Sequence, residues 1–227
     1  MIKINQKSDN PLSHKTECLI LPCPEERKPS GTLKIIDEAL NGAISGAFKN
    51  KRFEGKPNQT LLFNGIGSLK ADNLLLVGVG KTKDLTTEII CKASASASKL
   101  AEGSNFKFAS IYLNDSCFDK IAKGPRYGEL AAAVAEGAGL ALYHFDDYKS
   151  LNEKDSLPSR LQNLTLVPTT RTRQAALTKA IARAQKIVEA VHSARDLVSH
   201  PGNTATPTYL ANYAKKMARK SKVTCKV

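Results

Sequence analysis

The segment Ala190-Val-His-Ser-Ala-Arg-Asp-Leu-Val-Ser-His-Pro-Gly-Asn-Thr-Ala-Thr-Pro-Thr-Tyr-Leu210 lies near the end of the chain, and the rest of the sequence is organised around it. Its pattern predicts the end of one long helix, a turn built from Pro, Gly, Asn and Thr, and the start of a second helix. The residues before it carry the strands and helices of a whole domain, whereas only 17 residues follow it. We therefore expect the front part of a larger protein.

The composition is that of a globular protein with one large domain, or one domain and an extension. Of the 227 residues, 41% are hydrophobic and 24% are charged, which is enough apolar material for a substantial core. The five cysteines are an odd number without a Cys-x-x-Cys pair, a usage typical of reduced thiols in the cytoplasm. The N-terminus turns polar at once, and the longest apolar run, 130–143, has 14 residues including a glutamate. We therefore expect neither a secretory signal nor a membrane span.

The net charge of +13 is concentrated in the last quarter of the chain. Residues 171–227 hold twelve Lys and Arg against two Asp and Glu, a net charge of +10. Residues 1–70 carry +4 and residues 71–170 carry −1. The basic character therefore belongs to the C-terminal segment rather than to the domain before it.

The hydrophobic pattern predicts an α/β fold. Apolar runs predict strands at 1–5, 18–21, 60–63, 73–80, 106–113 and 161–167. Helical periodicity predicts helices at 33–47, 85–102, 124–143, 169–198 and 208–220. The first helix would hold Asp37 and Glu38 near its start, and Pro125 would be the first residue of the third helix. This order, with short connections, predicts a three-layer sandwich around one mixed sheet.

The predicted helix 169–198 is the longest element of the chain. It has an apolar stripe from Leu177 to Val198 and basic residues on the opposite side. We expect it to link two domains, with part of the stripe covered by the second domain. After the helix 208–220, a strand is expected to begin at Thr224.

The junction resembles that of the leucine aminopeptidase family, cytosolic metallo-exopeptidases that use two divalent metal ions. Members carry Arg-Asp-Leu-(Val/Ile) at a helix end, then a Pro-x-Asn turn, then Thr-Pro-x-Tyr-Leu before a basic helix. The corresponding residues are Arg195-Asp196-Leu197-Val198, Pro201-Gly202-Asn203 and Thr206-Pro207-Thr208-Tyr209-Leu210. Ser199 and His200 stand where the family usually has Asn and Thr, at positions not known to carry chemistry.

The resemblance covers nearly the whole chain in order. Segments similar to the family's N-terminal domain are Leu33–Ile44, Phe53–Lys56, Leu75–Lys81 and Glu136–Ser150. That domain has a fold similar to macro domains and is non-catalytic. The resemblance thus implies a macro-like N-terminal domain at 1–168, a linker helix at 169–198 and the truncated start of the catalytic domain at 199–227.

The resemblance also implies where the chemistry lies. The family's metal ligands and its catalytic Lys and Arg belong to the C-terminal domain, whose Asn-Thr-Asp-Ala-Glu-Gly-Arg segment is absent from this sequence. We therefore assign no catalytic, metal or cofactor-binding residue to this chain and expect it to be inactive alone. The intact protein would be a cytoplasmic homohexamer that uses two ions such as Mn or Zn to release N-terminal residues such as leucine from peptides. The C-terminal catalytic domain would be the partner of this chain, which alone would not bind the peptide substrate.

The segment Gly78-Val79-Gly80-Lys81-Thr82 invites comparison with a phosphate-binding loop. A Walker motif needs glycine where Leu75 stands, and a dinucleotide fingerprint needs it at Lys83. Both motifs fail, so we interpret these glycines as turning the chain between strand and helix.

Few other residues suggest a site. His14, Cys18 and Cys23 lack the paired spacing and the fourth ligand of a zinc site, and buried thiols are the favoured interpretation. We interpret His144, His192 and His200 as lone histidines, without a carboxylate pair that would make a site with any of them. The adjacent acids Glu25-Glu26, Asp37-Glu38 and Asp146-Asp147 would point in different directions, whereas general acid/base work needs two carboxylates converging on one bond.

Two other classes of function stay open. A macro-like domain could act alone and hold ADP-ribose or a related nucleotide at its strand ends, by analogy of fold. The basic segment 171–227 could bind DNA through phosphate contacts. Only Tyr209 and Tyr213 interleave with its charges, so a solvated face, or one that docks on the missing domain, is favoured.

Overall fold

The structure is a computed structural model. It describes residues 2–26, 28–118, 126–150, 160–170, 173–221 and 223–226.

A six-stranded sheet forms the centre of the molecule. The strands are β1 (Lys3–Gln6), β2 (Thr16–Pro24), β3 (Thr60–Asn64), β4 (Ala71–Gly80), β5 (Phe108–Leu113) and β6 (Asn163–Pro168). Their spatial order is β1-β6-β5-β2-β4-β3. All neighbouring pairs are parallel except β3 and β4. The six strands predicted between residues 1 and 167 are therefore confirmed, with shifted ends, and the sheet is mixed.

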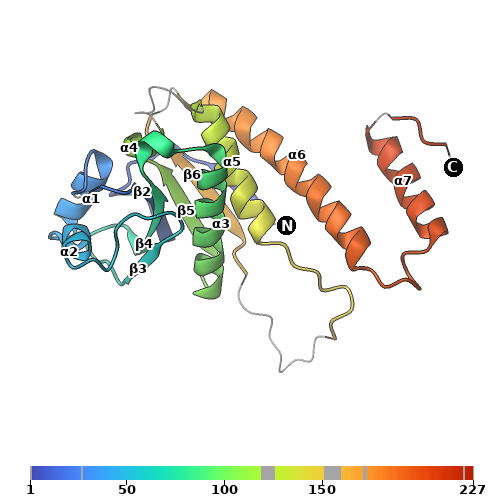
Figure 1. The fold of residues 1–227 in the computed structure, drawn as a ribbon, viewed down its shortest axis with the longest axis horizontal. Coiled ribbons are helices and arrows are strands. Elements are labelled where there is room, and N and C mark those ends of the chain that lie inside the picture. Colours follow the sequence, from blue (N-terminus) through green and yellow to red (C-terminus); the bar gives the residue numbers. More distant parts are fainter. Residues whose placement is uncertain are drawn as a thin grey trace.

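Helices cover both faces of the sheet (Figure 1). They are α1 (Thr32–Ala39), α2 (Ala43–Lys49), the 3-10 turn η1 (Thr82–Asp84), α3 (Thr87–Gly103), α4 (Asp115–Phe118), α5 (Tyr127–Ala141), α6 (Gln174–Ser199) and α7 (Pro207–Ser221). One core lies between the sheet and α3, α5 and α6, and a second lies between the sheet and α1 and α2. The predicted three-layer α/β sandwich is confirmed, while its similarity to macro domains stays a prediction.

The predicted single helix over 33–47 is wrong, because the chain forms two short helices there. Asn41 and Gly42 adopt positive φ angles of 53° and 79°, which an α-helix cannot accommodate. The turn keeps Leu33, Ile36 and Ile44 on the same buried side, so the apolar spacing continues across the break. Spacing alone therefore could not reveal the interruption.

The expectation for Asp37 is wrong for the same reason. Asp37 lies near the end of α1, and its carboxylate accepts hydrogen bonds from the backbone N–H of Ile44 at 2.8 Å and of Ser45 at 3.0 Å. The Ser45 hydroxyl also donates to it. Asp37 therefore satisfies the free N–H groups at the start of α2 rather than the dipole of its own helix.

The glycines at the end of β4 have a packing role that the sequence did not show. A Cβ placed on Gly78 would lie 2.0 Å from the carbonyl oxygen of Lys56. Gly78 also donates its backbone N–H to Gln59 O at 2.7 Å. Glycine is needed here because the loop that precedes β3 packs directly on the strand.

The C-terminal segment contains two helices. α6 begins at Gln174, five residues after the predicted start, and α7 matches its prediction. The expected strand is wrong for the described residues 223–226, which have no regular structure. The predicted helix start at Pro125 lies outside the described residues. Across the described part of the chain, no helix combines the length and apolarity needed to cross a membrane.

Only the first half of the apolar stripe on α6 is buried within this domain. Leu177, Ala184 and Val188 have exposed fractions of 0%, 0% and 2%, whereas Val198 is 86% exposed. The helix therefore packs on the core through its first half, against α5 and β1, and its end extends away from the core to where α7 follows (Figure 1).

Candidate functional site

The C-terminal end of α5 is fastened to the second half of α6 by side chains of the junction motif. Arg195 Nη1 donates to the carbonyl of Leu140 at 2.8 Å, and Asp196 Oδ1 accepts from the Tyr143 hydroxyl at 2.8 Å. His192 Nε2 lies 3.0 Å from the carbonyl oxygen of Gly139. Two of the last carbonyls of α5, which no residue of that helix can satisfy, are thus bound by α6.

Tyr143 is the centre of this junction. The Arg195 guanidinium lies over its ring at 5.3 Å from the centroid, and the His192 ring is 5.0 Å away. Partial burial, with Asp196 nearby, raises the pKa of Tyr143. Burial lowers the pKa of His192. Both groups are therefore neutral at physiological pH, and each contributes a hydrogen bond that ties the end of α5 to α6.

A second cluster surrounds His200 at the end of α6. Its Nδ1 is 2.8 Å from the Tyr148 hydroxyl, and its Nε2 is 3.1 Å from the Tyr209 hydroxyl. The ring of Phe145 packs edge-on against the imidazole at 5.3 Å. The histidine therefore joins the segment after α5 to the start of α7. In the sequence this position only looked like a departure from the family pattern.

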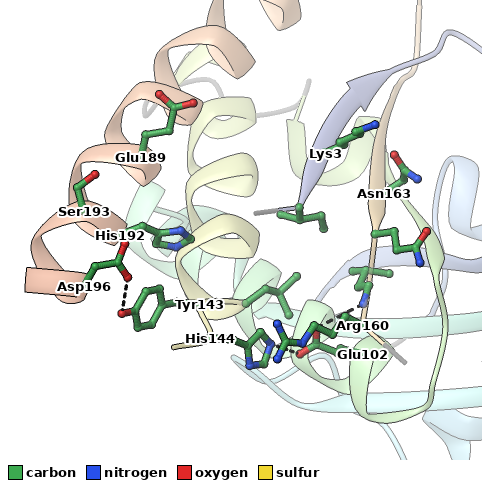
Figure 2. A pocket seen from close by; sticks show the side chains of 14 residues that line it. Lys3, Glu102, Tyr143, His144, Arg160, Asn163, Glu189, His192, Ser193 and Asp196 are labelled. Carbon is green, nitrogen blue, oxygen red and sulfur yellow. Dashed lines mark hydrogen bonds and ion pairs between the residues drawn. The ribbon is translucent and has the colours of Figure 1, made fainter. Parts of the chain in front are cut away.

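A cleft of about 760 Å³ opens between this junction and the sheet edge. Figure 2 shows Lys3 and Asn163 on its sheet side and Glu189, Ser193 and His192 on its α6 side. The cleft combines acidic, basic and amide side chains, so it suits a polar partner more than an apolar ligand.

Two polar side chains that line the cleft, His144 and Glu102, contact each other. His144 Nε2 is 3.0 Å from Glu102 Oε2, and the backbone N–H of Leu161 donates to Glu102 Oε1 at 3.3 Å. The sequence did not show the pairing of His144 with Glu102, because Glu102 lies 42 positions earlier, at the end of α3. The carboxylate of Glu102 is thus already engaged by His144 and by the backbone of Leu161.

The adjacent acids do not act as pairs. Asp146 forms ion pairs with Arg160 and, at 3.0 Å, with Lys149. These contacts lower the pKa of the Asp146 carboxyl, and the hydrogen bond from Arg160 has the largest effect. Glu26 accepts a hydrogen bond from the Ser30 hydroxyl at 2.9 Å.

The candidate metal ligands of the N-terminal half are not brought together. Cys18 belongs to the core beneath α3 and α5, whereas Cys23 belongs to the core beneath α1 and α2. Burial raises the pKa of the Cys18 thiol to about 12, and that of Cys23 also rises. His14 is buried and hydrogen-bonds to Asp9 and Ser110. Throughout the described ranges, no three His, Cys, Asp or Glu side chains gather where they could hold a metal ion.

The nucleotide and DNA hypotheses stay predictions. The pocket beneath the carboxyl ends of the central strands has a volume of about 10 Å³ and is lined mainly by apolar side chains such as Val79 and Ile90. That volume does not admit a nucleotide. On α7, Lys215 and Lys216 are exposed, as both DNA contact and simple solvation would require.

Comparison with known proteins identifies a family over most of the chain. Residues 20–152 match the family model described as the cytosol aminopeptidase family, N-terminal domain. A probable cytosol aminopeptidase of Geobacter sp. (strain M21) is 36% identical over 96% of this chain and 42% of its own length. One from Azotobacter vinelandii is 36% identical over 94% of this chain and 41% of its own length. The chain therefore spans less than half the length of these relatives.

Solved structures show the same fold. A tomato leucine aminopeptidase mutant superposes with a TM-score of 0.77 at 22% identity, over 97% of this chain and 42% of that chain. The bottromycin maturation enzyme BotP in complex with Mn gives a TM-score of 0.66 at 23% identity, over 91% of this chain and 37% of that chain. From the match over residues 20–152, supported by this fold, the chain belongs to the cytosol aminopeptidase family and contains the N-terminal domain of that family.

Proposed function

We propose that this chain is the non-catalytic N-terminal part of a cytoplasmic metallo-aminopeptidase that releases N-terminal residues such as leucine from peptides. The observation that carries the proposal is the family match over residues 20–152, together with relatives more than twice as long. The catalytic groups and two divalent ions, Mn or Zn, belong to a C-terminal domain of the same protein.

The proposed organisation follows from the position of α6. Residues 1–168 form the macro-like domain, 169–198 the linker helix, and 199–227 the start of the catalytic domain. Burial supports these boundaries, because α6 leaves the core along its own length and α7 is largely exposed. In the intact protein the exposed end of α6 would meet the catalytic domain, and the N-terminal domain would shape a hexamer.

The junction contacts give the linker helix a defined direction. Tyr143, His192 and Arg195 hold α6 at a point where its apolar contacts with the core have ended. Hydrogen bonds are directional, so they fix the angle of α6 relative to the core better than its non-directional apolar contacts do. We propose that these residues set the position of the catalytic domain relative to the N-terminal one.

The proposal is tested by measuring peptidase activity first for this chain alone and then for a chimera that adds a C-terminal domain. The 227-residue chain, incubated with leucine p-nitroanilide and Mn²⁺, should release no p-nitroaniline above the blank. A chimera that joins residues 1–200 to the C-terminal part of the Geobacter relative should hydrolyse the same substrate. Turnover by the chain alone would refute the non-catalytic assignment. A soluble, folded chimera without activity would refute the proposed role of residues 1–200 in the intact enzyme.

A further inference from the structure

Three side chains that take no part in the α5–α6 junction form a chain of hydrogen bonds. His14 Nδ1 lies 3.1 Å from Asp9 Oδ2, and His14 Nε2 lies 2.8 Å from Ser110 Oγ. Asp9 and His14 come from the segment between β1 and β2, whereas Ser110 lies in the middle of β5. A carboxylate, an imidazole and a hydroxyl in this order are the groups that serine hydrolases use to activate a nucleophile.

The carboxylate determines which nitrogen of His14 carries the proton. A hydrogen bond from Lys7, and a further one from His14, lower the pKa of the Asp9 carboxyl, so it is ionised at neutral pH. An ionised carboxylate only accepts hydrogen bonds, so His14 Nδ1 must carry a proton. In the neutral imidazole Nε2 is then a bare acceptor, and the Ser110 hydroxyl is the donor that faces it. The arrangement therefore points the Ser110 proton at a base.

The hydroxyl borders an open cleft. A cavity of about 520 Å³ is lined by His14, Thr16, Phe108, Ser110 and Thr165, among others. Thr165 is the register partner of Ser110 on β6, and Thr16 Oγ1 is 3.2 Å from Ser110 Oγ. The Thr16 hydroxyl donates to the carbonyl oxygen of Phe108 at 3.3 Å, so it is held in place beside Ser110 at one wall of the cavity.

Burial limits what can reach this group. Ser110 is 2% exposed and His14 is 3% exposed. Only a narrow part of a substrate can therefore reach the Ser110 hydroxyl at the bottom of the cleft. Phe108, which is 44% exposed, offers an apolar surface at the cavity for a ring or an alkyl group. The shape therefore selects small acyl groups carried on an apolar alcohol.

We propose that Asp9, His14 and Ser110 form a nucleophilic site that accepts short-chain acyl groups from esters, separate from the metallo-aminopeptidase chemistry of the family. Ser110 Oγ adds to the ester carbonyl while its proton passes to His14 Nε2. The carbon–oxygen bond to the alcohol then breaks, His14 returns the proton to the departing alcohol, and the acyl group remains on Ser110. Water repeats the sequence and releases the carboxylic acid, so the net reaction consumes one ester and one water.

The experiment measures the reactivity of Ser110 in the 227-residue chain. A fluorophosphonate probe forms a phosphorus–oxygen bond with an activated serine and releases fluoride. Tryptic mass spectrometry should place the label on Ser110. Ser110→Ala should abolish it, and Asp9→Asn should slow labelling at least about 10-fold, because the amide no longer fixes the imidazole tautomer. His14→Ala should slow it about 100-fold or more through loss of the base.

Matched controls separate reactivity from folding. Ser94 is also a buried serine, but its hydroxyl donates to the carbonyl of Val134 at 2.7 Å, so Ser94→Ala should leave labelling unchanged. Asp9 is partly exposed, and circular dichroism should show Asp9→Asn folded as in the wild type. With p-nitrophenyl esters, acetate should acylate the chain at least 10-fold faster than octanoate. Labelling that is absent from Ser110, or equal in Asp9→Asn and wild type, would show that the three residues are only a buried hydrogen-bond network.

Discussion

Replacing Asp37 by alanine should destabilise the protein more than any neighbouring surface change. Asp37 is 7% exposed, and its carboxylate binds two backbone N–H groups at 2.8 and 3.0 Å as well as the Ser45 hydroxyl. Loss of a capping side chain costs about 1–2 kcal/mol. Ile44 is buried, so its unpaired backbone N–H would add a desolvation penalty of about 1 kcal/mol or more. We therefore expect a loss of about 2–3 kcal/mol in the free energy of unfolding.

The adjacent residue supplies the control. Glu38 has the same charge, but its side chain is 67% exposed and lies 3.8 Å from Lys34, so Glu38→Ala should change stability by less than about 0.5 kcal/mol. Asp37→Asn keeps one acceptor oxygen and should fall between the two. Urea unfolding followed by far-ultraviolet circular dichroism measures all three. Equal losses in Asp37→Ala and Glu38→Ala would refute the capping role and favour one continuous helix over 33–47.

Three further perturbations test the packing, the junction and the thiols. Gly78→Ala should cost about 1–3 kcal/mol in urea unfolding, because the new Cβ would meet the carbonyl oxygen of Lys56 at 2.0 Å. Tyr143→Phe removes the hydrogen bond to the α6 carboxylate, and it should speed amide hydrogen exchange in the second half of α6 about three- to tenfold. In the native protein at pH 8, Cys18 and Cys23 should react with Ellman's reagent at least about 100-fold more slowly than in urea, since burial raises both thiol pKa values, that of Cys18 to about 12.

Each of these three has its own control. A Cβ on Gly46 in α2 would meet nothing within 4 Å, so Gly46→Ala should stabilise the protein by up to about 1 kcal/mol. Loss of stability in both glycine variants would mean that backbone conformation, not the loop contact, decides the effect. Exchange in α3 should be unchanged by Tyr143→Phe, and a uniform increase would indicate global destabilisation. Rapid native labelling of Cys18 would contradict its place in the core.

Much of the fold could be predicted because strand and helix signals are local. A run that is apolar on both faces, as at 73–80, has to be a central strand wherever its neighbours lie. The junction motif at 195–210 likewise carried the family resemblance in contiguous residues. The break within 33–47 escaped because a short turn preserved the apolar spacing, and the strand expected from Thr224 does not form in residues 223–226.

The sequence alone determined the fold class and the order of most strands and helices, which depend on local periodicity, and its contiguous motifs carried the resemblance to the family. Only the tertiary structure decided which distant side chains meet. His14 meets Ser110 across 96 positions, and Tyr143 meets Asp196 across 53. Such pairs depend on the order of the strands and on the direction of the helices, which the packing of the whole core sets. The hydrophobic periodicity around each residue of a pair therefore does not reveal its partner.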